Sequence, residues 1–353
     1  MTRLAAKLRK KGIHPQIVAV LCSWLQDRLA KVVVSGTASE GMTLRDMVFQ
    51  GTVTGPKLWN LFFEDARHAI NEYLFDEVVF ADDLNAYSIY SSATQNSVIT
   101  DALKKCQHEL HKWGDANQVA FDAGKESHHI LSLSEPQGSV FKLLGVPFDT
   151  ELSMGHAVSE LVSSAGWKLR TLLRTKRFYS GSDLILLYKA HLLSYLEYRT
   201  PAIYHATKAV LRRLDAVQRN FLRDVGVDEV NALVHFHLAP LDTRRDIAML
   251  GLIHRTVLGK GPQQFKDFFH TNPNCRSMLL DPRQSSRSPL LRRSTLGLVA
   301  VYNLLPRKVV SARSVSEFQK GLQEVVISFA SSGHPQWSEV LSPRLPLTSH
   351  PLA

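Results

Sequence analysis

Strand-like and helix-like patterns alternate over the first 150 residues of the chain. Apolar residues recurring near a 3.6-residue period predict helices, at residues 2–12, 15–25, 54–71 and 96–113. Shorter runs of β-branched or aromatic residues predict strands, at residues 31–35, 77–80, 86–90, 119–121, 129–133 and 141–148. This part of the chain is therefore expected to mix strands with helices.

The pattern changes near residue 160, beyond which only helical periodicity is found. Helices are predicted at residues 160–174, 182–196, 208–225, 243–258 and 316–329. Pro, Ser and Arg predict a mobile linker at 271–293, and several prolines predict a poorly ordered tail at 331–353. The fold class predicted is α+β, with regions at 1–150, 151–270, 271–293, 294–330 and 331–353.

Candidate metal chemistry is concentrated in Phe80-Ala81-Asp82-Asp83, which lies between two predicted strands. Asp82, Asp83 and Asn85 are typical of a hairpin turn. Adjacent carboxylates repel each other, and a divalent cation that prefers oxygen ligands relieves that repulsion. In a two-metal site such carboxylates support phosphoryl transfer. Because Asp-Asp is also common in surface turns, the pair alone leaves a plain turn open.

A second segment lies about thirty residues upstream. It reads Phe49-Gln50-Gly51-Thr52-Val53-Thr54-Gly55-Pro56 and continues into Leu58-Trp59-Asn60 on a predicted helix. Gly51 allows close approach of the backbone to a ligand, and the Gln50 amide offers both a donor and an acceptor. The alternative is that the glycines only shape a loop before the helix.

Charge is distributed unevenly along the chain. The net charge is +10, and residues 161–223 hold 12 Lys and Arg against 3 Asp and Glu, an excess of nine. Such a basic stretch suits a polyanion, because neutralised phosphates release counterions; a solvated helix face is the alternative. The aromatic residues Trp167, Phe178, Tyr188 and Tyr198 alternate with the bases. They are candidates for nucleic-acid contact, although aromatic residues at helical spacing more often pack in a core.

Several classes of protein are disfavoured. No apolar run reaches the roughly 18 residues of a membrane span, and no secretory signal is recognisable. The three cysteines, Cys22, Cys106 and Cys275, are few and far apart, which favours a reducing compartment, nuclear or cytoplasmic, over a disulfide framework. The set Cys106, His108, His111, His128 and His129 offers zinc ligands, but its spacing matches no tight zinc pair.

Taken together, these segments resemble the reverse transcriptases of non-LTR, LINE-type retrotransposons. That family carries Pro-Gln-Gly-Ser/Thr-x-x-Gly-Pro and then a Phe/Tyr-Ala-Asp-Asp hairpin at about this distance, and here Phe49 replaces the proline. Further matches follow in the family's order: residues 117–122 leading to Lys125, then 141–146 with Leu144-Gly145. The matches run from about residue 4 to residue 325.

The resemblance implies a palm, an antiparallel sheet with helices, followed by an all-helical thumb and a C-terminal helical region. It implies a Mg²⁺-dependent RNA-directed DNA polymerase whose partners are an RNA template, a DNA primer and dNTPs. Asp82 would be the main metal ligand, Asp83 the supporting carboxylate and Lys125 a phosphate contact or proton donor. The nucleotide or template contacts would be Phe49, Gln50, Gly51, Thr52, Phe80 and Ala81, and the primer grip would be Leu144 and Gly145.

One part of the family's palm is expected to lie upstream. The family has a third metal-binding carboxylate, in a Phe-x-Asp strand, and a fingers region before the helix that begins here near Leu4. We therefore expect an N-terminally truncated palm and thumb, with an incomplete two-metal site and little or no activity alone. The alternatives are a non-catalytic nucleic-acid-binding module and a non-functional remnant of a mobile element.

Overall fold

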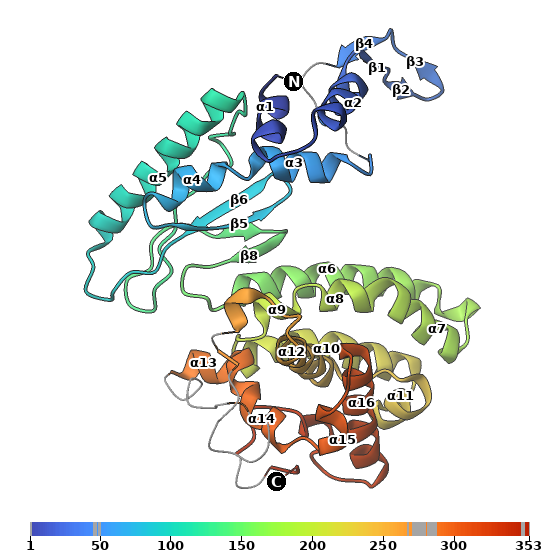
Figure 1. Cartoon of the computed structure of the whole chain (residues 1–353). Helices are drawn as coiled ribbons and strands as arrows, with labels where there is room; N and C mark the ends of the chain where they lie inside the picture. The colour runs from blue at the N-terminus through green and yellow to red at the C-terminus, as the bar shows by residue number, and fades with distance from the viewer. Residues whose placement is uncertain are drawn as a thin grey trace. The chain divides into compact units, whose positions relative to one another are not determined.

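The computed structural model of the chain describes residues 2–44, 48, 51–266, 268–269, 280, 288–346 and 350–352. The chain divides into two compact units, residues 1–130 and residues 131–353 (Figure 1). Helices dominate, and the described strands pair as four separate two-stranded antiparallel sheets. This confirms a mixed α+β fold, whereas the expected single palm sheet is not formed by the described residues. No described helix combines the length and apolar character needed to cross a membrane.

The first unit holds five helices and three pairs of antiparallel strands among its described residues. Its helices are α1 (Thr2–Lys10), α2 (Pro15–Leu25), α3 (Gly55–Phe63), α4 (Ala66–Asn71) and α5 (Asn96–Asn117). Its strands are β1 (Arg28–Ala30) with β4 (Met42–Leu44), β2 (Val33–Val34) with β3 (Thr37–Ala38), and β5 (Asp76–Phe80) with β6 (Asp83–Tyr87). One small core joins α1, α2 and α3 around Leu8 and Leu58, and another joins α4, α5 and the β5–β6 hairpin around Ile70 and Cys106.

The helix predicted over residues 54–71 is broken into α3 and α4 around Asp65. The Asp65 Oδ1 accepts hydrogen bonds from the Lys7 Nζ at 2.7 Å and from the Trp113 Nε1 at 3.0 Å. This carboxylate therefore links α1, the α3–α4 junction and α5. Such long-range partners override the local periodicity, which by itself favours one continuous helix.

Two predicted strands of the first unit were wrong. Residues 119–121 form no strand, and residues 129–133 contribute only an isolated bridge at Ile130. The chain reverses after α5, where Gln118 adopts a left-handed φ of 60° and the Val119 amide donates to the Gly114 carbonyl at 2.9 Å. A Cβ on Gly114 would lie 2.6 Å from the Val119 carbonyl oxygen. This close reversal keeps residues 119–121 out of a sheet.

The second unit is built mainly of helices. Its longer helices are α6 (Gly155–Arg174), α7 (Gly181–Tyr188), α10 (Lys208–Val225), α11 (Glu229–Phe236), α12 (Leu241–Val257), α14 (Leu298–Leu304) and α16 (Val315–Ser331). Shorter helices are α8 (Ser194–Glu197), α9 (Thr200–Ile203), α13 (Pro289–Arg293) and α15 (Arg307–Val310), and the hairpin is β7 (Phe141–Leu143) with β8 (Val146–Phe148). This hairpin lies in the second unit, where Val146 packs into the core that includes α6.

Between α7 and α8 the helix passes through a π-helical segment, Lys189–Leu193. The buried residues are Leu184, Ile185, Tyr188, Leu192, Leu193 and Leu196. A π-turn has a wider turn than an α-helix, so it keeps the buried residues before and after it on one side. Tyr188 is fully buried and stacks on Phe221 of α10, with ring centroids 4.4 Å apart.

A second core of this unit lies between α12, α14 and α16. His254 lies at its centre, 2.9 Å from the Tyr302 hydroxyl and 3.0 Å from the Ala312 carbonyl, and burial lowers its pKa. Residues 332–346 differ from the poorly ordered tail that their prolines predicted. Val340 and Leu341 are fully buried in this core, because this segment covers apolar residues that α12 and α16 would otherwise expose.

Candidate active site at the β5–β6 hairpin

The Asp82-Asp83 pair lies at the tip of the β5–β6 hairpin. Phe80 pairs with Asp83, so Ala81 and Asp82 form a two-residue loop. Ala81 has a left-handed φ of 57°, which costs a residue with a Cβ roughly 1–2 kcal/mol. A glycine is the usual residue at the first loop position of such turns. Asn85 was predicted in the turn but lies in β6, where it pairs with Val78 of β5.

The two faces of this hairpin are covered differently. Leu84 and Ala86 pack on the small core of α4 and α5. Phe80, 63% exposed, and Val78, 51% exposed, lie on the other face. Because paired residues share a face, Phe80 and Asp83 both lie on the open face. The hairpin therefore presents the Asp83 carboxylate and the Phe80 ring to the same side, and Asp82 lies in the exposed loop beside them.

Helix α3 holds the turn in place through Trp59. The Trp59 Nε1 donates a hydrogen bond of 2.6 Å to the Ala81 carbonyl. Its ring stacks on Phe63, with centroids 5.3 Å apart, and Phe63 packs edge-on against Trp113 of α5. The helix that follows the Gly51 segment is thus joined to the aspartate turn by one side chain. Sequence reasoning missed this role, since no spacing rule indicates a tryptophan–carbonyl bond across 22 residues.

The Trp59→Phe variant is expected to loosen the turn without unfolding the unit. It removes the indole donor and keeps an aromatic ring, and a hydrogen bond of this kind contributes about 0.5–1.5 kcal/mol. Amide hydrogen exchange over residues 80–83 should accelerate about two- to tenfold, with Trp24→Phe as the matched control. Unchanged exchange at these amides would contradict a positioning role for Trp59.

The carboxylates of Asp82 and Asp83 suit a hard cation by their chemistry. Both residues are exposed, and among the described residues neither side chain makes a hydrogen bond or an ion pair. Two free carboxylates on one tight turn are oxygen ligands of the type Mg²⁺ takes. In the same described part, no group of three or more His, Cys, Asp or Glu side chains is placed to hold a metal ion. The hairpin therefore offers two ligands and leaves the rest of a coordination shell to other groups.

The Gly51 segment is described only from its glycine onward, because Phe49 and Gln50 lie outside the described residues. Gly51 has a φ of 78°, a conformation that favours glycine. The Thr52 Oγ1 accepts a hydrogen bond of 3.2 Å from the Gly55 amide, and Pro56 occupies the first turn of α3, where proline is favoured. This part of the segment therefore starts the helix that carries Trp59.

Lys125 lies in an exposed turn after α5. Its Nζ is 3.5 Å from the Asp122 Oδ2, and its side chain is 84% exposed. The Asp122 side chain also accepts from the Gly124 amide at 3.0 Å. The structure thus gives Lys125 an accessible position and a weak surface ion pair, and its phosphate contact stays a prediction.

Two of the residues considered as zinc ligands, Cys106 and His111, contact other side chains instead. Cys106 is buried in the apolar core of α4 and α5, and burial raises its pKa to about 11. His111 stacks on Phe121, and its Nε2 lies 2.9 Å from the Glu126 Oε1. Both side chains are therefore engaged in packing or hydrogen bonding of their own.

In the second unit, Leu144 and Gly145 form the tip of the β7–β8 hairpin. Both have left-handed φ values, 47° and 78°, as a type I′ turn requires. Tyr198 directly follows α8, and its hydroxyl donates a hydrogen bond of 2.8 Å to the Leu144 carbonyl. Tyr198 is 63% exposed, so this contact fixes the turn while one side of the ring stays open.

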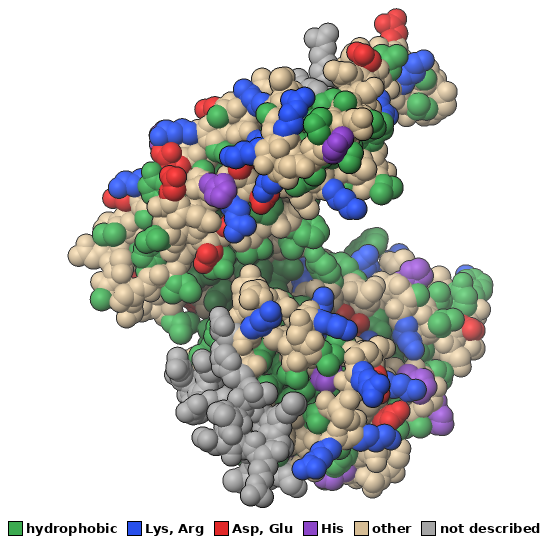
Figure 2. Space-filling view, in the orientation of Figure 1, with side chains coloured by type: hydrophobic (Ala, Val, Ile, Leu, Met, Phe, Trp, Pro, Cys, Tyr) green, Lys and Arg blue, Asp and Glu red, His purple; other side chains and the backbone are tan. Residues whose placement is uncertain are grey.

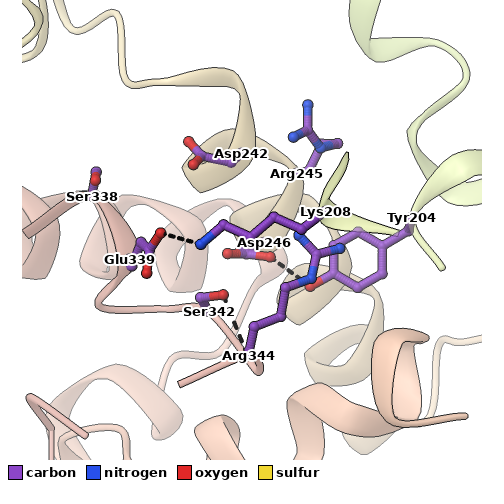
Figure 3. A pocket seen from close by; sticks show the side chains of 9 residues that line it. All are labelled: Tyr204, Lys208, Asp242, Arg245, Asp246, Ser338, Glu339, Ser342 and Arg344. Atoms are coloured by element: carbon purple, nitrogen blue, oxygen red, sulfur yellow. Dashed lines mark hydrogen bonds and ion pairs between the residues drawn. The ribbon is translucent and has the colours of Figure 1, made fainter. Parts of the chain in front are cut away.

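A polar cluster in the second unit was not anticipated from the sequence (Figure 3). It is lined by Tyr204, Lys208, Asp242, Arg245, Asp246, Ser338, Glu339, Ser342 and Arg344. The buried Tyr204 hydroxyl donates to the Asp246 Oδ1 at 2.5 Å, and burial raises the pKa of Asp246 to about 7. Lys208 pairs with Glu339 at 2.6 Å. The cavity among these side chains, about 10 Å³, holds no more than one water. The cluster joins residues 338–344 to α10 and α12.

The basic residues between 161 and 223 fall into two groups. Arg199 and Lys208 are engaged in ion pairs, with Glu160 at 2.7 Å and Glu339 at 2.6 Å, and the half-buried Lys189 donates to the Phe236 carbonyl at 3.0 Å. The exposed members are Lys168, Arg170, Arg174, Lys176, Arg177, Arg212, Arg213, Arg219 and Arg223. In Figure 2, blue Lys and Arg side chains and green hydrophobic side chains share the visible surface of this unit. Most of the positive charge found in the sequence is therefore available to a polyanion.

Comparison with known proteins gives two relatives of the same kind. The chain is 23% identical over 234 residues to the RNA-directed DNA polymerase from mobile element jockey of Drosophila funebris, which covers 61% of this chain and 26% of the relative. It is 21% identical over 339 residues to the jockey protein of Drosophila melanogaster, covering 90% of this chain and 34% of the relative. The chain spans about a quarter to a third of these relatives. No protein-family model matches it, and no solved structure matches it. The similarity supports a reverse-transcriptase relationship.

Proposed function

We propose that the chain is the palm and thumb portion of a non-LTR retrotransposon RNA-directed DNA polymerase. The observation that carries the proposal is the Trp59–Ala81 hydrogen bond, which joins the Gly51–α3 segment to the aspartate turn. The two segments that resemble the family are thus adjacent in this unit, as a shared site requires. The similarity to the jockey polymerases supports the same reading.

In this proposal Asp82 and Asp83 hold Mg²⁺ during nucleotidyl transfer to a primer 3′ end. The ion supplies charge neutralisation for the phosphoryl group. Ala81 and Phe80 flank the ligands, and the open face of the hairpin leaves both carboxylates accessible. Lys125 is proposed as a phosphate contact or proton donor, and the Leu144-Gly145 turn as the primer grip. Substrates would be an RNA template, a DNA primer and dNTPs.

Among the described residues, the two carboxylates of the hairpin do not by themselves complete a two-metal site. Two carboxylates from one turn can share a cation, but two ions about 4 Å apart need further ligands. We therefore propose that the described hairpin is a partial site, and that the chain alone is inactive or nearly so. The basic second unit favours a second candidate function, binding of a nucleic acid without catalysis.

Iron-mediated cleavage tests the metal site independently of activity. Fe²⁺ in place of Mg²⁺, with ascorbate and peroxide, generates hydroxyl radicals that cut the backbone beside the bound ion. Cleavage of the full chain near residues 80–83, suppressed by excess Mg²⁺, is expected. It should disappear in Asp82→Asn/Asp83→Asn and persist in the matched surface variant Asp122→Asn. Equal cleavage in the wild type and in the double variant would rule out the hairpin as the metal site.

A further inference from the structure

We infer that the outer face of α6, continued by the turn that follows it, is a stacking site for single-stranded nucleic acid. The site consists of Trp167, Arg170 and Arg174 on the helix, with Arg177 and Phe178 after it. It deepens the proposal that the second unit handles nucleic acid, and it concerns residues distant in sequence from the aspartate hairpin.

The first observation is the separation of the aromatic residues by burial. Trp167 is 66% exposed and Phe178 is 69% exposed, whereas Tyr188 is fully buried. Burying a tryptophan or a phenylalanine is strongly favourable. Two large rings left open on one short stretch therefore indicate a surface that meets another molecule.

The second observation is the helical phase of the exposed residues. Trp167, Arg170 and Arg174 are spaced by three and four residues, so they lie on one face of α6. That face is opposite to the buried residues Leu161, Ala165 and Leu169, which pack in the unit's core. With a rise of about 1.5 Å per residue, Trp167 and Arg174 lie roughly 10 Å apart along the axis, a span that a short run of nucleotides covers.

The third observation is that the arginines of this surface are not paired with carboxylates in the described part of the chain. The ion pairs among the described residues of this unit use Arg199, Lys208, Arg244 and Arg245. Arg170 and Arg174 are exposed and, within the described residues, have no carboxylate partner. The Arg177 guanidinium lies 4.6 Å from the centroid of the Phe178 ring, so charge and ring act together. Unpaired cations beside exposed rings are complementary to a strand of phosphates and bases.

The combination favours a single strand over a duplex. Bases in a duplex are already stacked on each other, so an exposed tryptophan gains little from them. In a single strand, base stacking on an aromatic ring adds to backbone attraction and is tolerant of sequence. A lipid surface of anionic headgroups shares the charge requirement, and the experiment therefore includes it as a competing outcome.

Binding of fluorescein-labelled oligo-dT to the full chain, followed by anisotropy, tests the inference. Trp167→Leu is expected to weaken binding about ten- to a hundredfold, while Trp167→Phe retains most of the affinity. Leu186→Ala is the matched control, because Leu186 is also 66% exposed but offers no ring to stack. Arg170→Ala should reduce the slope of log affinity against log salt by about 0.7, whereas Trp167→Leu should leave that slope unchanged.

Three results would overturn the inference: wild-type affinity in Trp167→Leu, an equal loss in Leu186→Ala, or a preference for phosphatidylserine vesicles over oligo-dT. A failure here is distinguishable from failure of the metal site. Asp82→Asn/Asp83→Asn is expected to bind oligo-dT as the wild type does, and Trp167→Leu is expected to keep iron-mediated cleavage near residues 80–83. Circular dichroism of each variant confirms that the exposed substitutions leave the helices folded.

Discussion

With Mg²⁺, dNTPs and a primed RNA template, this chain alone is expected to extend the primer at least about a thousandfold more slowly than the Drosophila melanogaster jockey polymerase assayed beside it. Each 1.36 kcal/mol of lost transition-state stabilisation is a factor of about ten, and the metals contribute several kcal/mol. Asp82 and Asp83 supply two ligands from one turn, and the described residues add no third ligand near them.

The variant Asp82→Asn/Asp83→Asn serves as the control for that measurement. If the chain has residual extension, this variant should abolish it, since the reaction would then depend on the same carboxylates. Extension by the unmodified chain at a rate like that of the jockey enzyme would show that the two-ligand site is sufficient, and the proposal of an incomplete site would be withdrawn.

The Asp215→Ala variant is expected to destabilise the second unit by about 3–5 kcal/mol. The Arg245 Nη2 lies 2.6 Å from the Asp215 Oδ1, and both side chains are more than nine-tenths buried. Removal of the carboxylate leaves a buried guanidinium without its partner. In the described structure the Arg245 Nη1 also has no hydrogen-bond partner. Urea unfolding of the full chain, followed by helical circular dichroism, measures the change.

The double variant Asp215→Leu/Arg245→Met separates the pair from its packing. Burial raises the pKa of Asp215 despite the neighbouring Arg245, which indicates that attraction within the pair does not fully offset the cost of desolvation. The double variant should therefore lose much less stability than Asp215→Ala. If it loses as much or more, the pair itself contributes net stability, and the order of the two variants would be reversed.

Elements with strong local signals were predictable from the sequence. Helix α10 matches its predicted bounds, because Thr207 caps its start and Gly226 adopts the left-handed conformation at its end. The hairpin around Asp82 lies where it was predicted in the chain, but its loop holds two residues, Ala81 and Asp82, instead of the five between the predicted strands 77–80 and 86–90. Helix α11 was missed even though Asp228 is an N-cap whose side chain accepts from the Asn231 amide; that signal was present and was outweighed by the shortness of the helix.

What sequence could not supply was the set of long-range contacts. The break at Asp65 depends on Lys7 and Trp113, which are 58 and 48 residues away. Trp167 is exposed and Tyr188 is buried because only Tyr188 faces another helix. The two residues lie at similar helical positions in the sequence, so the pattern alone does not distinguish them. The same holds for the candidate site. The sequence indicated the two carboxylates as candidate ligands, but it did not indicate the Trp59 indole that bonds to their turn.

The π-helical segment Lys189–Leu193 has a consequence for tracing this region across distant relatives. A segment of this kind contains one residue more than an α-helical turn would use. A related helix shorter by that single residue would present the same inward side without any bulge. Alignments through this stretch should therefore be allowed a one-position gap, and a shift in phase there is not a sign of a different fold.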